Sequence, residues 1–287
     1  MQMVMNLDVD EYVNPNFTVN VASVPQRSPF RYPGGKTWLI PTVRKWLSQT
    51  NQKILIEPFA GGGIVSLTAA FEGYSHQIVM AELDPEIAAV WQTILGDENN
   101  WLANRILSFE LTIENINSEI LRENKSVREI AFCTILKNRT YHGGIIAKGS
   151  GLLKHGENGR GILSRWYPRT LYDRIKNIDK IKQYIAFKFE DAYDLIEHNI
   201  DNPDAFFFID PPYTKAGKRL YTLFDVDHED LFEKVSRIRG KFMLTYDDTP
   251  QIRHYADKYG LLYKTIPMKT THHLQKNELL ITDNLNW

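Results

Sequence analysis

The amino-acid sequence predicts an α/β fold with a mostly parallel sheet and a final antiparallel hairpin. Two observations lead to this prediction. The run Ala205–Ile209 is entirely apolar, which is typical of a strand buried on both faces of a parallel sheet. Strand-like and helical segments alternate at 53–57, 64–71 and 77–83, and such a β-α-β unit places its strands parallel. A chain of 287 residues is long enough to bury the core of such a sheet.

The first half of the chain is expected to begin with an extended leader, residues 1–26, which shows no clear periodicity. Helices and strands then follow in a regular order. Gly73 is typical of a helix end, and Pro85 is typical of a helix start. The predicted elements are a helix at 38–47, a strand at 53–57, a helix at 64–71, a strand at 77–83, and helices at 85–95, 101–122 and 127–138.

The second half opens with a glycine-rich, basic stretch that breaks the pattern until about Tyr167. Beyond it, apolar strands and helices alternate again. The segment 278–282 is expected to return against 261–266 as a hairpin, which gives the sheet its antiparallel end. The predicted elements are strands at 184–189, 205–209, 241–245, 261–266 and 278–282, and helices at 192–198, 228–239 and 252–259.

Composition excludes several classes of protein. Hydrophobic residues make up 43% of the chain and charged residues 24%, as in ordinary soluble domains. Cys133 is the single cysteine, so neither a disulfide within the chain nor a thiol metal cluster can form. The histidines match no metal-ligand spacing, and we predict no metal site. No apolar run is long enough for a membrane span and no secretory signal is present, so we expect an intracellular, cytoplasmic protein.

Charge is distributed unevenly along the chain. The formal net charge is −1, which by itself does not suggest a polyanion ligand. The segment 137–176, however, holds nine lysines and arginines against two acidic residues. A positive zone on an otherwise acidic protein predicts that one face meets a polyanion such as nucleic acid.

The sequence Asp210-Pro211-Pro212-Tyr213 follows directly on the apolar run at 205–209. The two prolines lack backbone N–H groups and end the strand, while the carbonyls of Asp210 and Pro211 stay free to accept hydrogen bonds. This motif therefore places an acid, a carbonyl and an aromatic ring at the carboxyl edge of the sheet, where ligands bind. Such a set suits a planar aromatic amine, whose two N–H groups are accepted while Tyr213 stacks on its ring.

Three glycines, Gly61 to Gly63, follow the strand at 53–57 and indicate a tight turn that a ligand can approach closely. Position 66 is Ser66, so the turn departs from the dinucleotide pattern G-x-G-x-x-G, and a pyrophosphate ligand is disfavoured. Glu82 ends the next strand, where an acid accepts hydrogen bonds from ribose hydroxyls. An adenosine ligand without phosphates, such as S-adenosylmethionine, suits both features.

The segment Phe30–Lys36 reads Phe-Arg-Tyr-Pro-Gly-Gly-Lys and opens the helix at 38–47. It lacks the first glycine of the phosphate loop G-x-x-x-x-G-K-[ST], so we do not interpret it as a phosphate cradle. Lys36 is instead expected to face a carboxylate, such as that of a methionine moiety, with Tyr32 against an aromatic ring.

The order of these three motifs resembles the adenine-specific DNA methyltransferases of the D12 class, which includes the GATC methylases. The resemblance runs from Pro29 to about Asp283. It implies a Rossmann-like S-adenosylmethionine-dependent methyltransferase fold, in which 27–97 and 180–287 form the catalytic domain and 98–179 an inserted target-recognition domain. It also implies a cofactor site made by Tyr32, Gly34, Lys36, Glu57, Phe59, Gly61, Gly63, Glu82, Asp191 and Asp210.

The same resemblance implies double-stranded DNA as the partner, with a cognate restriction endonuclease as a further, separate partner. Asn277-Glu278-Leu279-Leu280 resembles the family's closing motif, whereas 141–168 does not resemble the recognition sequence of the GATC methylases. The motif at 210–213 would hold a flipped adenine. Residues implied in DNA binding, either by the motif or by their charge, are Asn138, Arg139, Tyr141, Lys148, Lys154, Arg160, Arg165 and Arg169.

The expected reaction is one direct methyl transfer to the exocyclic amine of adenine. Accepting the amine's hydrogens at Asp210 and at the carbonyl of Pro211 frees the nitrogen lone pair as the bond forms, which stabilises the transition state. Cys133 lies in a predicted helix far from every motif, so we expect no covalent enzyme intermediate.

Other functions fit parts of the pattern. Cytosine carries a similar amine beside a ring nitrogen, so the same acceptors would suit a cytosine N4-methyltransferase. A nicotinamide-dependent oxidoreductase would explain the glycine turn and Glu82, but not Asp210–Tyr213 or the basic segment. A DNA-binding module without catalysis is the third alternative, and the intact acid at Asp210 argues against it.

Overall fold

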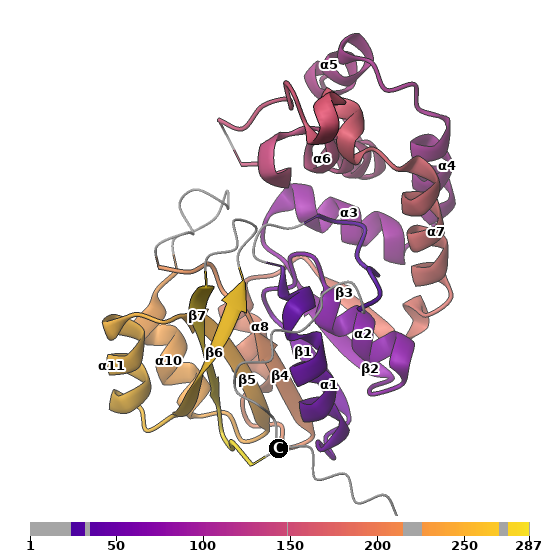
Figure 1. Cartoon of the computed structure of the whole chain (residues 1–287). Helices are drawn as coiled ribbons and strands as arrows, with labels where there is room; N and C mark the ends of the chain where they lie inside the picture. The colour runs from indigo at the N-terminus through magenta and orange to yellow at the C-terminus, as the bar shows by residue number, and fades with distance from the viewer. Residues whose placement is uncertain (1–23, 32–34, 148, 215–225, 270–274, 287) are drawn as a thin grey trace, which may run out of the picture.

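The computed structural model describes residues 24–31, 35–147, 149–214, 226–269 and 275–286 (Figure 1). Seven strands form one sheet in the order β3-β2-β1-β4-β5-β7-β6. The first five strands of this order are parallel, and β7 runs antiparallel to both β5 and β6. The strands are β1 Ile54–Glu57, β2 Gln77–Ala81, β3 Ile185–Lys188, β4 Ala205–Ile209, β5 Lys241–Asp247, β6 Leu262–Lys269 and β7 Gln275–Thr282. The predicted parallel sheet with a final antiparallel hairpin is confirmed.

Helices cover both faces of the sheet. On one face α1, α2 and α3 pack on Leu55, Phe206 and Leu280, and on the other face α8, α10 and α11 pack on Phe207 and Leu279. Neighbouring residues of a strand point to opposite faces, so a strand as apolar as β4 supplies both cores. The helices are α1 Ile40–Ser48, preceded by the 3-10 turn η2 Lys36–Leu39, α2 Ile64–Glu72, α3 Pro85–Leu95, α8 Ala192–Asn199, α10 His228–Ser236 and α11 Pro250–Lys258.

Of the helices that lie between β2 and β3 in the chain, α5 and α6 are above α3 in the view of Figure 1, and α4 and α7 are to its right. Apolar residues of α4, α6 and α7 belong to the same core as α2 and α3. The division into a catalytic domain and an inserted domain at 98–179 stays a prediction, because no break in packing marks its limits. The helices of this group are α4 Asn99–Ser108, α5 Ile113–Leu121, α6 Val127–Thr140 and α7 Pro168–Asp179.

The single helix predicted at 101–122 is wrong, because the chain forms α4 and α5 with a break between them. Phe109 is extended, and its ring packs edge-on against Phe132 at 5.1 Å between ring centroids. Thr112 then caps α5, its hydroxyl accepting a hydrogen bond from the backbone of Asn115 at 3.1 Å. The packing of the partly buried Phe109 ring and the new cap together outweigh continuation of the helix.

Helix α7 was not among the predicted elements. Its buried residues Leu171, Ile175 and Ile178 lie at helical spacing. The many charged residues between them obscured this spacing in the sequence. None of the described helices combines the length and apolar content that crossing a bilayer requires.

Candidate active site

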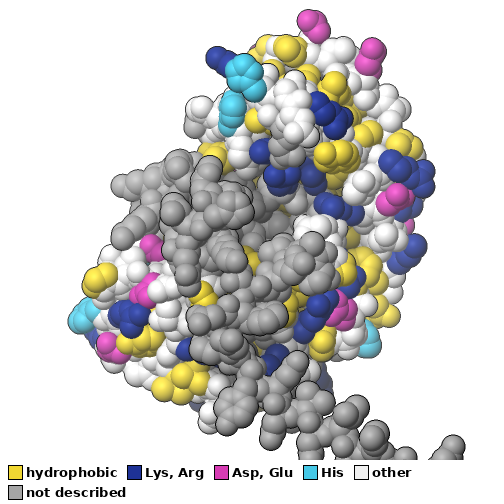
Figure 2. Space-filling view, in the orientation of Figure 1, with side chains coloured by type: hydrophobic (Ala, Val, Ile, Leu, Met, Phe, Trp, Pro, Cys, Tyr) yellow, Lys and Arg dark blue, Asp and Glu magenta, His cyan; other side chains and the backbone are white. Residues whose placement is uncertain are grey.

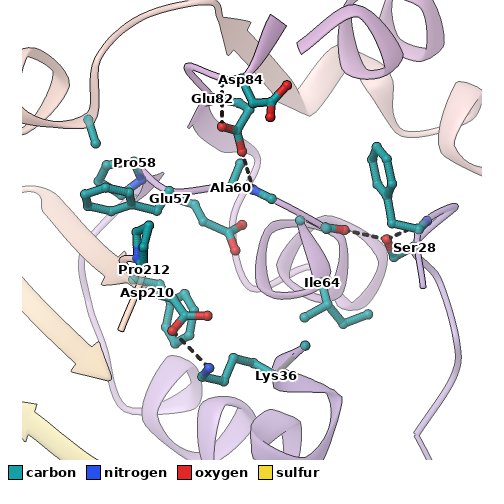
Figure 3. A pocket seen from close by; sticks show the side chains of 18 of the residues that line it. Ser28, Lys36, Glu57, Pro58, Ala60, Ile64, Glu82, Asp84, Asp210 and Pro212 are labelled. Atoms are coloured by element: carbon teal, nitrogen blue, oxygen red, sulfur yellow. Dashed lines mark hydrogen bonds and ion pairs between the residues drawn. The ribbon is translucent and has the colours of Figure 1, made fainter. Parts of the chain in front are cut away.

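A cavity of about 260 Å³ opens at the carboxyl edge of the sheet, where β2, β1 and β4 lie side by side (Figure 3). The strand order reverses between β1 and β4, and ligands of open α/β sheets bind at such a point. Tyr32 and Gly34 lie outside the described residues. The predicted site residues that line the cavity are Lys36, Glu57, Phe59, Gly61, Gly63, Glu82, Asp191, Asp210 and Pro212.

The turn after β1 lines the cavity, and its conformation requires glycine. Gly61 and Gly63 have φ angles of 46° and 60°, in the left-handed region that favours glycine. A Cβ atom at Gly63 would lie 2.7 Å from side-chain atoms of both Met80 and Trp91. The indole N–H of Trp91 also donates to the carbonyl of Gly61 at 2.9 Å. The sequence therefore fixes a tight backbone surface on which a ligand can lie.

Glu82 follows β2 and faces this turn (Figure 3). Its Oε2 accepts from the backbone N–H of Gly61 at 3.0 Å, and its Oε1 accepts from those of Leu83 at 2.9 Å and Asp84 at 3.0 Å. Burial raises the pKa of the Glu82 carboxyl to about 7, although these donors lower it. The carboxyl group is thus fixed at the carboxyl end of β2, where the sequence analysis predicts an acceptor for ribose hydroxyls.

Glu57 ends β1 and is almost fully buried, with 3% of its surface exposed. Its Oε2 accepts from the backbone N–H of Ser66, in the first turn of α2, at 2.9 Å. Burial raises the pKa of the Glu57 carboxyl to about 8, and the nearby Asp210 carboxylate raises it further while Ser66 opposes the shift. Within the described part of the chain, no lysine or arginine forms an ion pair with Glu57.

Asp210 directly follows β4 and is held through one of its two oxygens. Its Oδ1 accepts from the hydroxyl of Thr245 at 2.7 Å and lies 2.9 Å from Nζ of Lys36. Among the residues that the structure describes, Oδ2 accepts no hydrogen bond. The described residues therefore fix one oxygen of this carboxylate and donate no hydrogen bond to the other.

The remaining residues of the motif are arranged around Asp210. Pro211 is buried, and Pro212 lines the cavity. Tyr213 is partly exposed, and its hydroxyl donates to Oε2 of Glu278 at 2.9 Å. The ring of Tyr213 stacks on that of Tyr246, with 5.8 Å between the centroids. The motif thus presents a carboxylate and an anchored aromatic ring to the same side of the sheet.

Two residues of this site, Thr245 and Glu278, were not among the predicted site residues. Thr245 lies on β5, and the register that pairs Ile209 with Leu244 brings it level with Asp210. Glu278 lies on β7 opposite Asp247, at the same edge. The closing motif that contains Glu278 was visible in the sequence, but only the pairing of β5 with β7 shows where its side chain lies.

Three predicted cofactor residues take contacts within the protein. Lys36 is 4% exposed and pairs with Asp210, so the carboxylate that it faces belongs to this chain. Asp191 caps α8, accepting from the backbone of Tyr193 at 2.8 Å. Phe59 packs edge-on against the Tyr193 ring. All three line the cavity, and their contact with a cofactor stays a prediction.

The lining of the cavity is predominantly acidic. Five acidic side chains face two basic ones, those of Arg31 and Lys36, and the raised pKa values of Glu57 and Glu82 leave these two acids partly protonated near neutral pH. This balance favours a ligand that carries positive charge and disfavours a pyrophosphate. The five acids are Glu57, Glu82, Asp84, Asp191 and Asp210.

Two of the residues predicted to bind DNA lie inside the protein. Asn138 is fully buried in α6, where its side chain accepts from the backbone N–H of Arg31 at 2.8 Å and donates to the carbonyls of Arg31 and Gly144 at 3.0 and 2.9 Å. Arg139 is 6% exposed and donates to the carbonyl of Pro29. Both side chains hold the segment before η2 against α6, so we do not propose either as a DNA contact.

Burial, helped by the guanidinium groups of Arg174, Arg31 and Arg165, lowers the pKa of Arg139 to about 9. The remaining predicted DNA contacts differ in exposure. Lys154, Arg160 and Arg169 are exposed, whereas Tyr141 and Arg165 are partly buried. Lys148 lies outside the described residues. Figure 2 shows lysine and arginine side chains gathered on the helical part of the molecule, on the face seen there.

This fold, with a glycine turn after β1, an acid after β2 and Asp-Pro-Pro-Tyr after β4, defines a Rossmann-like methyltransferase. The sequence matches the family model of the D12 class N6 adenine-specific DNA methyltransferases over residues 32–142 and 153–270. The chain belongs to this family of DNA methyltransferases, and the resemblance seen in its motifs is confirmed.

Individual relatives are distant. The Type II methyltransferase M.MjaIII of Methanocaldococcus jannaschii is 22% identical over 272 residues, which cover 83% of this chain and 88% of that protein. Among solved structures, the rRNA methyltransferase aviRa of Streptomyces viridochromogenes has a TM-score of 0.43 at 13% identity, covering 94% of this chain and 96% of that one. Precorrin-6y C5,15-methyltransferase of Geobacter metallireducens has a TM-score of 0.37 at 10% identity, covering 84% and 85%. The family assignment depends on the family match and not on these structures.

Proposed function

We propose that this protein transfers a methyl group from S-adenosylmethionine to the exocyclic N6 amine of an adenine that has left the stack of duplex DNA. The observation that carries the proposal is the state of Asp210, whose Oδ1 is fixed by Lys36 and Thr245 while Oδ2 accepts no hydrogen bond from the described residues. A carboxylate held in this way is ready to accept an N–H group without reorganising, which is how preorganised groups lower a barrier.

The cavity suits S-adenosylmethionine by its chemistry. The bound cofactor would supply an electrophilic methyl group on a positively charged sulfur. Glu82 would accept the ribose hydroxyls, Asp191 and Phe59 would contact the adenine, and the backbone of Gly61 and Gly63 would allow close approach. The excess of carboxylates favours the positive charge, whereas a nicotinamide dinucleotide would bring its pyrophosphate to an acidic wall.

The residues after β4 would act on the target amine. Oδ2 of Asp210 and the carbonyl of Pro211 would each accept an N–H, which draws the nitrogen out of conjugation with the ring as its lone pair forms the bond to the methyl carbon. The bond between that carbon and the sulfonium sulfur would break at the same time, so that S-adenosylhomocysteine leaves, and the methylated amine would lose its surplus proton to Asp210 or to water. Tyr213, a partly exposed residue, would stack on the base, and stacking of this kind contributes roughly 1 to 3 kcal/mol towards the cost of extruding it.

Double-stranded DNA would contact the basic segment through its exposed side chains, Lys154, Arg160 and Arg169, with Arg165 beside them. Phosphate contacts would fix the position of the protein, and an arginine bidentate to guanine would give about 1 to 3 kcal/mol of base discrimination. The Type II relative supports a role in modification next to a separate restriction endonuclease.

The test is to incubate the purified protein with unmethylated genomic DNA and S-adenosylmethionine labelled with tritium in the methyl group, and then to separate the nucleosides. We expect the label in N6-methyladenine. Label in N4-methylcytosine would replace adenine by cytosine as the target, and unlabelled DNA would refute the proposal. Sequencing the modified bases in a host genome would then give the recognition site.

A further inference from the structure

Glu278 lies beside the motif after β4 although the two are 65 residues apart in the chain. Side chains alternate along β7, so Leu279 packs in the core on the α10 face and Leu280 in the core on the α1 face. Glu278 therefore shares its face with Leu280 and with η2, which carries Lys36. It is 5% exposed, at a position where an apolar residue would normally be expected.

Two functional groups of the candidate active site converge on one oxygen of Glu278. The hydroxyl of Tyr213 donates to its Oε2 at 2.9 Å, and Nζ of Lys36 lies 3.8 Å from the same atom. Lys36 continues the network, because Nζ is 2.9 Å from Oδ1 of Asp210 and 4.8 Å from the centre of the Tyr213 ring. One buried ammonium group thus lies between two carboxylates and an aromatic ring.

This arrangement carries an energetic cost. A buried ion pair gains little over an apolar contact of the same volume, because both charges lose their hydration. Burial raises the pKa of the Glu278 carboxyl, and Lys36 opposes this shift by favouring the charged form. The acid is therefore poorly explained by stability, whereas fixing the direction of Tyr213 and Lys36 requires an acceptor at this place.

We infer that Glu278 is a positioning residue for methyl transfer: by holding the hydroxyl of Tyr213 and the ammonium of Lys36, it sets the orientation of the ring that stacks on the target base and of the Asp210 carboxylate. This inference rests on the proposed function. Glu278 is not among the residues that line the cofactor cavity. Its loss should therefore slow the transfer step and leave cofactor affinity unchanged.

The experiment compares E278A and E278Q with the wild-type protein. Single-turnover methylation of unmethylated genomic DNA gives the transfer rate, and calorimetry with S-adenosylhomocysteine gives the affinity of the cofactor site. We expect E278A to lower the rate about 100-fold, the loss typical of a small displacement in an active site. Affinity for S-adenosylhomocysteine should stay within about twofold. E278Q should recover about a tenth of the wild-type rate, because its amide oxygen still accepts from Tyr213.

Two further variants separate positioning from general damage. D283N removes the partner of Lys241, 2.6 Å away, at the opposite end of the same strand pair, and should leave the transfer rate unchanged. Y213F removes the hydroxyl that Glu278 accepts. If Glu278 acts through that hydroxyl, adding Y213F to E278A should cost less than Y213F costs in the wild-type protein.

An E278A protein that methylates at the wild-type rate would overturn the inference while leaving the proposed function intact. So would parallel losses of rate, S-adenosylhomocysteine affinity and thermal midpoint in both Glu278 variants, because they would show a purely structural role. A wild-type protein that binds S-adenosylhomocysteine but labels no DNA would refute the proposed function, and this inference with it.

Discussion

The carboxyl edge of the sheet and the basic segment 137–176 were both identified from the sequence. The structure brings the predicted residues together at the sheet edge, whereas it buries or pairs several of the basic side chains. At the sheet edge, Glu57, Glu82 and Asp210 each follow or end a strand, and β2, β1 and β4 are neighbours. Parallel strands that lie side by side end at the same edge, so residues far apart in sequence must meet there. The backbone topology itself brings these groups together.

In the basic segment no such constraint operates. A charge count treats all its arginines and lysines alike, but several of them are buried or bonded to other groups of the protein. Lys137 pairs with Glu86, Arg174 donates to the carbonyl of Ser28 at 2.9 Å, and Arg139 is buried. A charge count therefore overstates the positive surface that DNA can meet. Comparison of the two regions shows that a strand end predicts position, whereas a run of charge does not predict exposure.

The largest effect is expected at the sheet edge, from Asp210→Ala. Loss of the acceptor for the target amine should reduce single-turnover methylation about 1000-fold, as removal of a preorganised transition-state contact does. Binding of S-adenosylhomocysteine should survive. Thr245→Val keeps the carboxylate but removes the hydroxyl that holds it at 2.7 Å, and should cost about tenfold. An undiminished rate in the Asp210 variant would show that the sheet edge has been misassigned.

The next largest effect is expected from a substitution in the basic segment, and it should lower the free energy of unfolding. Asn138→Ala removes three hydrogen bonds of a fully buried side chain and leaves backbone groups of Arg31 and Gly144 without their partner. We expect the free energy of unfolding, measured with urea, to fall by about 3 kcal/mol. The salt dependence of DNA binding should not change. A stable variant with weakened DNA binding would instead restore Asn138 as a DNA contact.

The sequence was sufficient for the positions of the strands along the chain, the parallel sheet and the hairpin, because each depends on local apolar patterns and turn residues. It was also sufficient for the residues that lie at strand ends. Thr245 and Glu278 could not be found in this way, since their closeness to Asp210 depends on which strands pair and in what register. Pairing of β5 with β7 joins segments that no local pattern relates.

Two further differences between the sequence analysis and the structure have a similar cause. Residues 101–122 have helical character throughout, but the partly buried Phe109 packs against Phe132 and Trp166, and the helix breaks there. Asn138 and Arg139 were read as DNA contacts from a motif, although α6 turns both toward the segment before η2. In each instance a tertiary contact decided what the local sequence left open.

A smaller effect tests the electrostatics of the sheet edge. The pKa of Glu57 is raised to about 8 in the folded protein from an ordinary value of 4.5. Between these values the folded state keeps a proton that the unfolded chain has lost, so the free energy of unfolding should fall as pH rises. The slope contributed by one such proton is about 1.4 kcal/mol per pH unit at most. Glu82, with its pKa raised to about 7, adds a contribution of the same sign.

Glu57→Gln keeps an acceptor for the N–H of Ser66 and removes the titration. Urea unfolding of the ligand-free variant at several pH values between 5.5 and 8.5 should therefore give a shallower decline than the wild-type protein shows. Equal slopes in the two proteins would mean that Glu57 is ionised in the empty site.

The smallest effect concerns the exposed part of the basic segment, where Arg160 is expected to contact a DNA phosphate. Each phosphate that a side chain neutralises adds about 0.9 to the slope of log affinity against log salt concentration. Arg160→Ala should reduce that slope by about 1 without changing stability. The control is Arg239→Ala. Arg239 carries the same charge, but it lies just before β5, at the amino end of the sheet, and forms an ion pair with Asp201. If both variants keep the wild-type slope, Arg160 is an exposed arginine that neutralises no DNA phosphate.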